Sequence, residues 1–254
     1  MSWQSERYLQ FAGERTRPAE ELASRIPLEQ AQHVADLGCG PGNSTAILRA
    51  RYPHATLTGI DSAPDMLNKA KASGLDATWV EADAAEWEPE QQLDVLFSNA
   101  LLQWIDDHET VFPRLMGMVK PGGVLAVQMP QNFAAPSHEL LRETAREDRF
   151  RKTLEPLLRT DPVGTAEYYT SILEPHAASL DIWETTYVQR LTGDDPVLDW
   201  VRGTALVPIL GALGRMDATA FLETYGEKLR LAYSKRPNGV TLFPFKRLFI
   251  VARR

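Results

Sequence analysis

VADLGCGPGNS, residues 34–44, is the stretch that decides the fold of this chain. An apolar run ends in Asp36, glycines follow at positions 38, 40 and 42, and Asn43 or Ser44 can cap a following helix. Glycine adopts positive φ angles and lets the backbone approach a ligand without an intervening Cβ atom. In open parallel sheets, ligands bind beyond the carboxyl ends of the strands. The stretch therefore predicts a strand, a tight turn and a helix, with a cofactor lying over the turn.

The residues around this stretch alternate between short apolar runs and helical patterns. The runs predict strands, and the patterns between them predict helices that end at a proline or glycine. The predicted strands are 33–38, 55–61, 77–83, 93–100 and 124–130, and the predicted helices are 43–53, 63–74 and a helix with its turn at 108–123. This alternation predicts an α/β fold, a Rossmann-like and mostly parallel sheet with helices on both faces.

The pattern changes after Pro130. Residues 136–175 and 195–235 are predicted to be helical with breaks, while 180–191 and 242–254 are predicted to be two edge strands that bring the sheet to seven. We expect a single domain over 1–254 with an inserted α-helical cap. Its predicted parts are an N-terminal helical lid (1–30), a cofactor-binding half (31–130), the cap with an edge strand (131–240) and a final strand (241–254).

Composition limits the classes of partner. The chain has 254 residues, 44% of them hydrophobic, and a net charge of −7, which argues against a nucleic-acid or anionic-membrane binder. Cys39 is the single cysteine, so an internal disulfide is impossible and a reducing, cytoplasmic setting is expected. The start of the sequence resembles no secretory signal, and no apolar run reaches the roughly 18 residues of a membrane span.

The glycine pattern discriminates between cofactors. A dinucleotide site would place its third glycine where Asn43 stands, and a phosphate-binding P-loop would need a lysine nearby. The pattern D-x-G-x-G-x-G instead resembles motif I of the class I S-adenosylmethionine-dependent methyltransferases. The resemblance implies that Asp36 contacts the amine of the methionine part and that the glycines pass beside the adenosyl sulfonium. No metal is predicted.

The ends of the next strands extend the predicted cofactor site. Asp61 ends the second strand, 25 residues after Asp36, where an acid can accept hydrogen bonds from ribose hydroxyls. The resemblance implies that Asp83 lies beside the adenine amino group. Asn99 and Ala100, at the end of the fourth strand, are placed to line the site beneath the methyl group. The predicted cofactor site consists of Asp36, Gly38, Cys39, Gly40, Asn43, Asp61, Ser62, Met66, Asp83, Ala84, Asn99 and Ala100.

Further segments carry a narrower resemblance. ERTRP (14–18), LLQWIDDHETVFPRL (101–115), GGVLAVQMPQN (122–132), DIWETTY (181–187) and RLFIVARR (247–254) resemble the trans-aconitate 2-methyltransferase family. This resemblance implies a single methyltransferase domain that forms the monomethyl ester of trans-aconitate, a small tricarboxylic acid, and releases S-adenosylhomocysteine.

The implied chemistry requires no catalytic base. A carboxylate with a pKa near 4 is already the anionic nucleophile at neutral pH, so the enzyme aligns the reactants, excludes water and holds the spare carboxylates. Arginine and tyrosine side chains suit that task. The predicted acceptor residues are Tyr8, Arg15, Arg17, Trp104, His108, Gln128, Tyr168 and Tyr169, and weaker candidates are Met129, Asn132, Arg202 and Arg247. Adjacent tyrosines on a helix point about 100° apart, so we expect at most one of Tyr168 and Tyr169 to face the acceptor.

Several alternatives stay open from the sequence. Another small acid could be the acceptor, or a phenol or carbon acid that would need a base such as His108 or Asp107. A non-catalytic cofactor-binding protein could share the fold, and a nucleotide-dependent oxidoreductase is a third possibility. A nucleic-acid methylase is disfavoured, since SNAL (98–101) stands where amino-methylating DNA enzymes carry Asn-Pro-Pro-aromatic.

Overall fold

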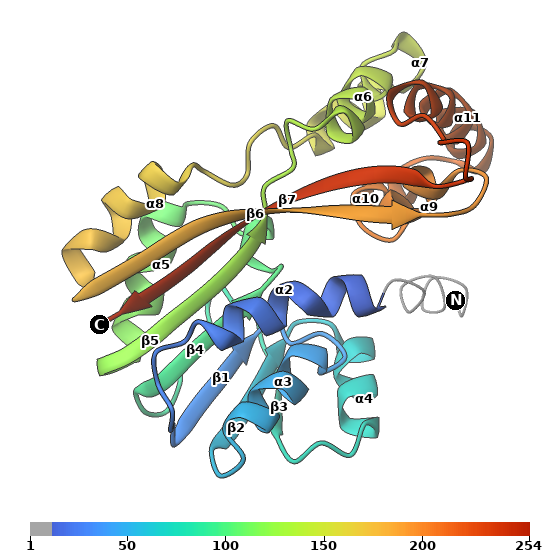
Figure 1. The fold of residues 1–254 in the computed structure, drawn as a ribbon. Helices are drawn as coiled ribbons and strands as arrows, with labels where there is room; N and C mark the ends of the chain where they lie inside the picture. The colour runs from blue at the N-terminus through green and yellow to red at the C-terminus, as the bar shows by residue number, and fades with distance from the viewer. Residues whose placement is uncertain (1–11) are drawn as a thin grey trace. The chain divides into compact units, whose positions relative to one another are not determined.

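The computed structural model describes residues 12–254, with side chains from Thr16 onward (Figure 1). Tyr8 and the side chain of Arg15 lie outside this description. The chain divides into two compact units. The sheet unit comprises 13–130, 163–185 and 247–254, and the described part of the helical unit comprises 131–162 and 186–246, with Ala12.

Seven strands form one sheet in the order β3-β2-β1-β4-β5-β7-β6. Strands β1 to β5 are parallel to their neighbours, and β7 runs antiparallel to β5. The strands are β1 (His33–Leu37), β2 (Thr56–Asp61), β3 (Thr78–Glu81), β4 (Leu93–Asn99), β5 (Val119–Pro130), β6 (Ser179–Leu191) and β7 (Thr241–Arg253). The predicted seven-stranded, mostly parallel sheet is confirmed.

Two details of the sheet differ from the prediction. Strand β7 was expected at an edge but lies between β5 and β6, because its apolar run from Leu248 to Ala252 is covered on both faces. Strand β5 begins at Val119 rather than 124, with a register shift opposite Leu93 and Val95. A Cβ atom on Gly123 would lie 2.8 Å from the backbone oxygen of Asp94, so glycine is required where β5 passes β4.

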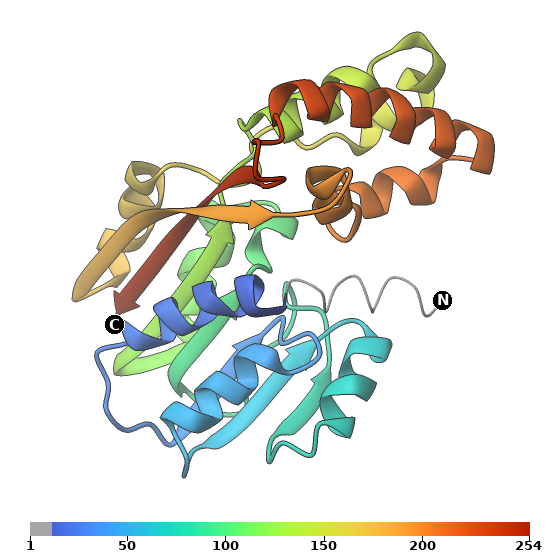
Figure 2. The ribbon, with the colours of Figure 1, turned by 45° about the vertical axis from the view of Figure 1, so that its right-hand side comes forward.

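Helices cover both faces of the sheet unit, as predicted. Figures 1 and 2 show α2 and α3 on one face, and α5 and α8 on the other. The helices of this unit are α2 (Ala12–Ser24), α3 (Asn43–Arg51), α4 (Pro64–Ala72), η1 (Leu102–Trp104), α5 (His108–Met118), α8 (Ala166–Leu173) and η3 (Glu174–His176). No helix within residues 12–254 is long and apolar enough to cross a membrane.

The helical unit has its own core. Its helices are α6 (Pro136–Ala145), α7 (Asp148–Leu154), η2 (Glu155–Leu157), α9 (Pro196–Arg202), α10 (Leu206–Ala212) and α11 (Arg215–Ala232). They enclose a cluster of buried aromatic side chains: Phe150, Trp200, Phe221, Tyr225, Phe243 and Phe245. The boundaries of the predicted cap, 131–240, stay a prediction. Within this range, α8 and the first half of β6 belong to the sheet unit.

Candidate cofactor and acceptor site

The glycine turn after β1 is fixed by backbone contacts with β2. The N–H groups of Gly38 and Cys39 both donate to the carbonyl of Ile60, at 2.8 and 3.0 Å. Gly38 has a φ of +75°, and an added Cβ atom would lie 2.7 Å from Leu101. Gly40 has a φ of +54°, but a Cβ atom there would meet nothing within 4 Å. Packing therefore requires Gly38, whereas Gly40 borders open space in which a ligand could lie.

Asp61 ties this turn to the start of α4. Its Oδ2 atom accepts from the N–H of Gly40 and its Oδ1 atom from the N–H of Ala63, both at 2.9 Å. A carboxylate offers about four acceptor positions, so Asp61 can still accept from hydroxyl groups of a ligand. The side chain thus holds the turn and keeps acceptor capacity at the same edge of the sheet.

Asp36 lies fully buried beneath the turn. Its Oδ2 atom accepts from the hydroxyls of Ser44 (2.7 Å) and Thr45 (2.6 Å). Its Oδ1 atom is buried and has no partner among the described residues. The pKa of Asp36 is raised to about 6, and burial is the main cause. The hydrogen bonds from Thr45 and Ser44 partly oppose this rise, and repulsion from the nearby Asp61 adds to it. The turn therefore covers a carboxyl group with one oxygen satisfied and one buried oxygen without a described donor.

The expected helix cap is wrong in detail. Gly42 is the N-cap residue of α3, with a φ of 93°, and no side chain caps that end. Ser44 instead donates to Asp36, because the first turn of α3 passes directly over the end of β1, and Asn43 is exposed. Sequence reasoning also missed Thr45, although it directly follows the quoted stretch.

The end of β3 carries the residues predicted for adenine. Asp83 is exposed, and its Oδ1 atom accepts from the N–H of Ala85 at 2.8 Å, as in a turn. Arg114 donates to the carbonyls of Ala84 and Trp87, which holds this loop in place. Ser62 is exposed and Met66 is half-buried on α4. The structure brings these residues to the same sheet edge as Asp36 and Asp61, and their contacts with a cofactor stay predictions.

The turn after β4 is strained. Ala100 has a φ of 59°, a conformation that is uncommon for residues other than glycine, and its N–H donates to the carbonyl of Gln128 at 2.9 Å. Such strain often occurs at functional sites. Asn99 Oδ1 and Gln103 Oε1 are buried without partners in the part of the chain that the structure describes. Gln103 was not predicted, and its place in the turn after a strand end was the available signal.

Gln128 continues this polar cluster on the neighbouring strand, where it is the register partner of Asn99. It is fully buried, and its Oε1 atom accepts from Arg247 Nη1 at 3.0 Å. Because a guanidinium only donates, the orientation of the amide is fixed, and Nε2 is the atom without a described partner. Arg247, on β7, is 5% exposed. A buried amide donor near the end of β5 thus lies beside a buried cation in the middle of β7.

His108 and Tyr169 satisfy each other rather than facing open space. The Nε2 atom of His108 lies 2.9 Å from the carbonyl of Leu102, so it carries the proton, and Nδ1 accepts from the Tyr169 hydroxyl at 2.7 Å. The N–H of Gly164 donates to the same hydroxyl at 3.1 Å. Both side chains are buried, and burial raises the pKa of Tyr169. This geometry gives them a bracing role between α5 and α8, while their role as acceptor ligands stays a prediction.

The remaining predicted acceptor residues are more accessible. Arg17 is exposed on α2, Trp104 is 50% exposed on η1, and Tyr168 is half-buried with its ring against that of Tyr169. Of the two adjacent tyrosines, Tyr168 is half-buried and Tyr169 is fully buried, and the expectation that at most one faces a ligand stays a prediction.

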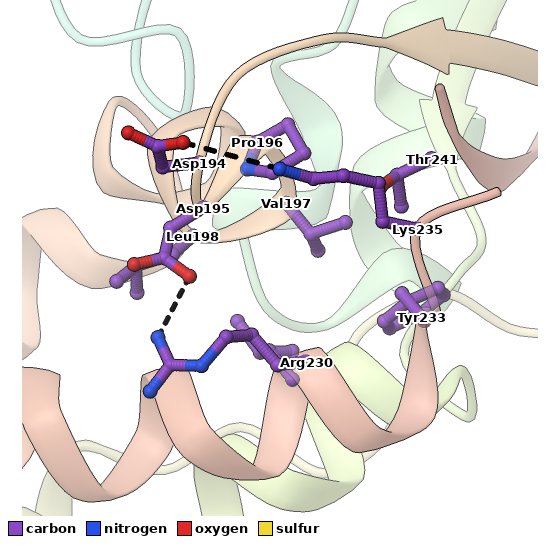
Figure 3. A pocket seen from close by; sticks show the side chains of 10 residues that line it. Asp194, Asp195, Pro196, Val197, Leu198, Arg230, Tyr233, Lys235 and Thr241 are labelled. Carbon is purple, nitrogen blue, oxygen red and sulfur yellow. Dashed lines mark hydrogen bonds and ion pairs between the residues drawn. The ribbon is translucent and has the colours of Figure 1, made fainter. Parts of the chain in front are cut away.

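The helical unit contains a cavity of about 210 Å³ (Figure 3). Arg230 forms an ion pair with Asp195 at 2.7 Å, and Lys235 lies 3.9 Å from Asp194. The lining has two cations and two acids, so the cavity offers no net positive charge to a carboxylate ligand. Across residues 12–254 no group of His, Cys, Asp and Glu side chains could hold a metal ion.

The fold and the glycine turn define the class of protein. The family described as "Methyltransferase domain" matches residues 34–123. Among solved structures, the YcgJ protein of Bacillus subtilis has a TM-score of 0.62 at 13% identity, covering 94% of this chain and 98% of that one. A phosphoethanolamine N-methyltransferase 2 of Haemonchus contortus, in complex with S-adenosylhomocysteine, has a TM-score of 0.55 at 16% identity, covering 93% and 52%. These likenesses establish the methyltransferase fold.

Comparison with curated relatives identifies the family within the methyltransferases. Trans-aconitate 2-methyltransferase of Escherichia coli O139:H28 is 46% identical over 252 residues, covering 99% of this chain and 98% of the relative. Its namesake in Azoarcus sp. strain BH72 is 44% identical over 253 residues, covering 100% and 99%. The chain belongs to the trans-aconitate 2-methyltransferase family.

Proposed function

We propose that this chain transfers a methyl group from S-adenosylmethionine to a carboxylate oxygen of trans-aconitate. The products are the monomethyl ester and S-adenosylhomocysteine. The observation that carries the proposal is the match at 44–46% identity over nearly the whole length of relatives that bear this enzyme's name. Because the match extends beyond the motif I half, it supports the acceptor as well as the cofactor.

The described residues fit the cofactor at the sheet edge. The unpartnered Oδ1 atom of Asp36 suits the ammonium of the methionine part, and the free lone pairs of Asp61 suit the ribose hydroxyls. The open space beside Gly40 leaves room for the chain of the ligand. Asp83, Ala84 and Met66 are the proposed adenine contacts. Bound S-adenosylmethionine supplies an electrophilic methyl group on a sulfonium.

The acceptor would bind beyond the ends of β4 and β5. Its attacking carboxylate needs no base, because it is ionised at neutral pH. Gln128 Nε2 and Arg247 are donors suited to a spare carboxylate, and Asn99 would lie beneath the methyl group. Arg17, Tyr168 and Trp104, together with Tyr8 and Arg15, stay proposed acceptor contacts. The protein's contribution is alignment and exclusion of water.

A labelled-methyl assay tests the reaction. Enzyme and S-adenosylmethionine labelled in its methyl group are incubated with trans-aconitate, cis-aconitate, citrate or no acid, and each product is treated with mild alkali. We expect alkali-labile label in trans-aconitate above the other acids, because alkali hydrolyses a methyl ester. Faster transfer to another acid would mean that this acid, not trans-aconitate, is the acceptor. Alkali-stable label would mean that the methyl group is not in an ester. Cofactor binding without any transfer would favour a non-catalytic protein.

We also propose that the partners are small molecules and that the reaction takes place in the cytoplasm. The net charge of −7 disfavours nucleic acid, and the single cysteine is compatible with a reducing compartment. Fractionation of the source cells and a binding assay with random-sequence DNA test these two points.

A further inference from the structure

We propose that Ser44 and Thr45 are positioning residues for the cofactor: they hold the buried Asp36 carboxylate so that its second oxygen receives the ammonium group of the methionine part, directly or through one water. The inference rests on the proposed function, since it assumes S-adenosylmethionine as the cofactor. It assigns a role to two side chains that lie outside the predicted contact set.

The geometry places both hydroxyls on the same oxygen. Ser44 and Thr45 are consecutive residues in the first turn of α3, and both donate to Asp36 Oδ2, at 2.7 and 2.6 Å. Thr45 is fully buried and Ser44 is 7% exposed. Two donors on Oδ2 fix the rotation of the carboxyl group and leave Oδ1, which is also buried, as the carboxyl oxygen without a described partner.

The unpartnered Oδ1 atom indicates which kind of ligand group would bind there. A buried polar atom without a hydrogen bond is costly, and a buried charge is more so. Two hydroxyl donors do not neutralise the charge of a carboxylate. A ligand cation that binds at Oδ1 would neutralise that charge and supply the missing hydrogen bond. The ammonium group of S-adenosylmethionine has the required charge and donors.

The surrounding charges make this binding depend on pH. Asp61, at the end of β2, repels a charge on Asp36, and Cys39 in the same turn stays a neutral thiol because burial raises its pKa. Without the cofactor, burial holds the pKa of Asp36 at about 6, so the carboxyl binds a proton below that pH. A bound ammonium favours the ionised form, and binding near pH 6 would therefore release a proton to solvent.

Isothermal titration calorimetry of two ligands tests the assignment. S-adenosylhomocysteine carries the ammonium group, whereas 5′-methylthioadenosine has the same nucleoside and sulfur without it. Titrations run from pH 5 to 8, in buffers of different ionisation enthalpy to count protons. The variants are Ser44→Ala, Thr45→Ala and the double variant. Ser44→Thr and Thr45→Ser keep the hydroxyls, and Ser73→Ala removes a hydroxyl that donates to the Ala70 carbonyl instead.

For the native chain we expect the affinity for S-adenosylhomocysteine to fall up to tenfold per pH unit below about 6, while that for 5′-methylthioadenosine changes little. The double variant should lose about tenfold to a hundredfold in affinity for the first ligand at pH 7, with the midpoint of its pH dependence moved upward. Thr45→Ser and Ser44→Thr should restore most of the loss.

An equal loss for both ligands would overturn the assignment, because it would indicate a general loosening of α3. An unchanged pH dependence in the double variant would also overturn it. If the double variant does not fold, the single variants carry the same test. If the native chain binds neither ligand, the proposed cofactor is wrong, which is a separate outcome from a failure of the positioning role.

Discussion

The two units differ in where their strained residues and paired charges lie. In the sheet unit, buried polar atoms of Asp36, Asn99 and Gln103 have no described partner, and the two non-glycine residues of positive φ known from the described chain, Ala100 and Asp107, follow β4. In the helical unit, Lys228 is shared by Glu143 and Glu147 at 2.9 Å, above a core of packed aromatic rings. The helical unit also has buried atoms without a described partner, Asn132 Nδ2 and Arg202 Nε, but the strained residues follow β4. This favours the strand ends of the sheet unit as the location of the proposed chemistry.

Removing an aromatic side chain from the helical core should give the largest effect on stability. Phe221 is fully buried, with its ring 5.3 Å from that of Phe150. Phe221→Ala should lower the free energy of unfolding by about 3–5 kcal/mol, because it removes packing and leaves a cavity. Denaturant unfolding measures this change, and Met216→Ala, on the same helix but 83% exposed, is the matched control.

The same variant separates the two units functionally. We expect Phe221→Ala, at a temperature where it is folded, to bind S-adenosylhomocysteine within about twofold of the native chain. A large loss of affinity would mean that the cofactor site depends on the helical unit, and the contrast between the units would fail.

Substitution of Asp61 should give the largest effect on binding. Asp61→Ala removes the acceptor of the Gly40 and Ala63 N–H groups, so it should weaken S-adenosylhomocysteine binding by about tenfold to a hundredfold. Calorimetry measures the affinity, and circular dichroism checks that the fold is kept. Asp65→Ala, an exposed acid on α4, should bind normally. Unchanged affinity in Asp61→Ala would remove Asp61 from the site.

Substitution of the two turn glycines should affect different properties: Gly38→Ala chiefly the stability of the fold, and Gly40→Ala chiefly the affinity for the cofactor. Gly38→Ala combines a positive φ with a clash against Leu101, so it should destabilise the fold by more than the roughly 1–2 kcal/mol of the left-handed conformation. Gly40→Ala incurs the conformational cost alone, but its Cβ atom projects into the proposed ligand space, so binding should suffer more. Gly74→Ala has a similar φ of +72° and open space away from the turn, and controls for the conformational cost. Thermal melts with and without S-adenosylhomocysteine measure both quantities, and equal ligand shifts for Gly40→Ala and Gly74→Ala would contradict this expectation.

The pH dependence of stability should differ in sign between the units, and because the two contributions oppose each other, their net effect on the native chain should be the smallest of the series. The folded pKa of Asp36 is raised to about 6 from 3.8, chiefly by burial, so its contribution to stability is present at low pH and is lost as pH rises from about 4 to about 6. Burial lowers the pKa of His138 to about 4 from 6.5, with Arg142 adding to the shift, so its contribution is lost as pH falls over about 6.5 to 4.

Thermal melts of the ligand-free chain between pH 4 and 7 test these signs. Asp36→Asn should remove the fall in stability toward pH 6, and His138→Gln should remove the fall toward pH 4. The same pH profile in both variants would contradict opposite signs.

The architecture was predictable because it follows from local patterns. The alternation of apolar runs and helices predicted the first five strands, and two later apolar segments predicted the last two. Glycine with Asp36 and Asp61 indicated the sheet edge at which we propose that the site lies. The interior place of β7 was missed, since an apolar strand at the end of a chain shows its burial but not its neighbours.

Side-chain partners were predictable to a lesser degree. His108 and Tyr169 are 61 residues apart, and only the packing of α8 on α5 explains why they bind each other. Thr45 and Gln103 carry no motif of their own, and their importance follows from a buried carboxylate and a strained turn. The sequence pattern predicts the edge of the sheet at which polar side chains lie together. Tertiary packing determines which of these side chains bond to each other and which could still bind a ligand.

The crystal structure of the chain with S-adenosylhomocysteine and trans-aconitate is the most direct test that the chemistry lies at the strand ends of the sheet unit. We expect the ribose hydroxyls within hydrogen-bond distance of Asp61, the sulfur beside Gly40, and a carboxylate of the acid facing that sulfur beyond β4 and β5. Density for the nucleoside elsewhere, or an acid bound in the cavity of the helical unit, would contradict this location.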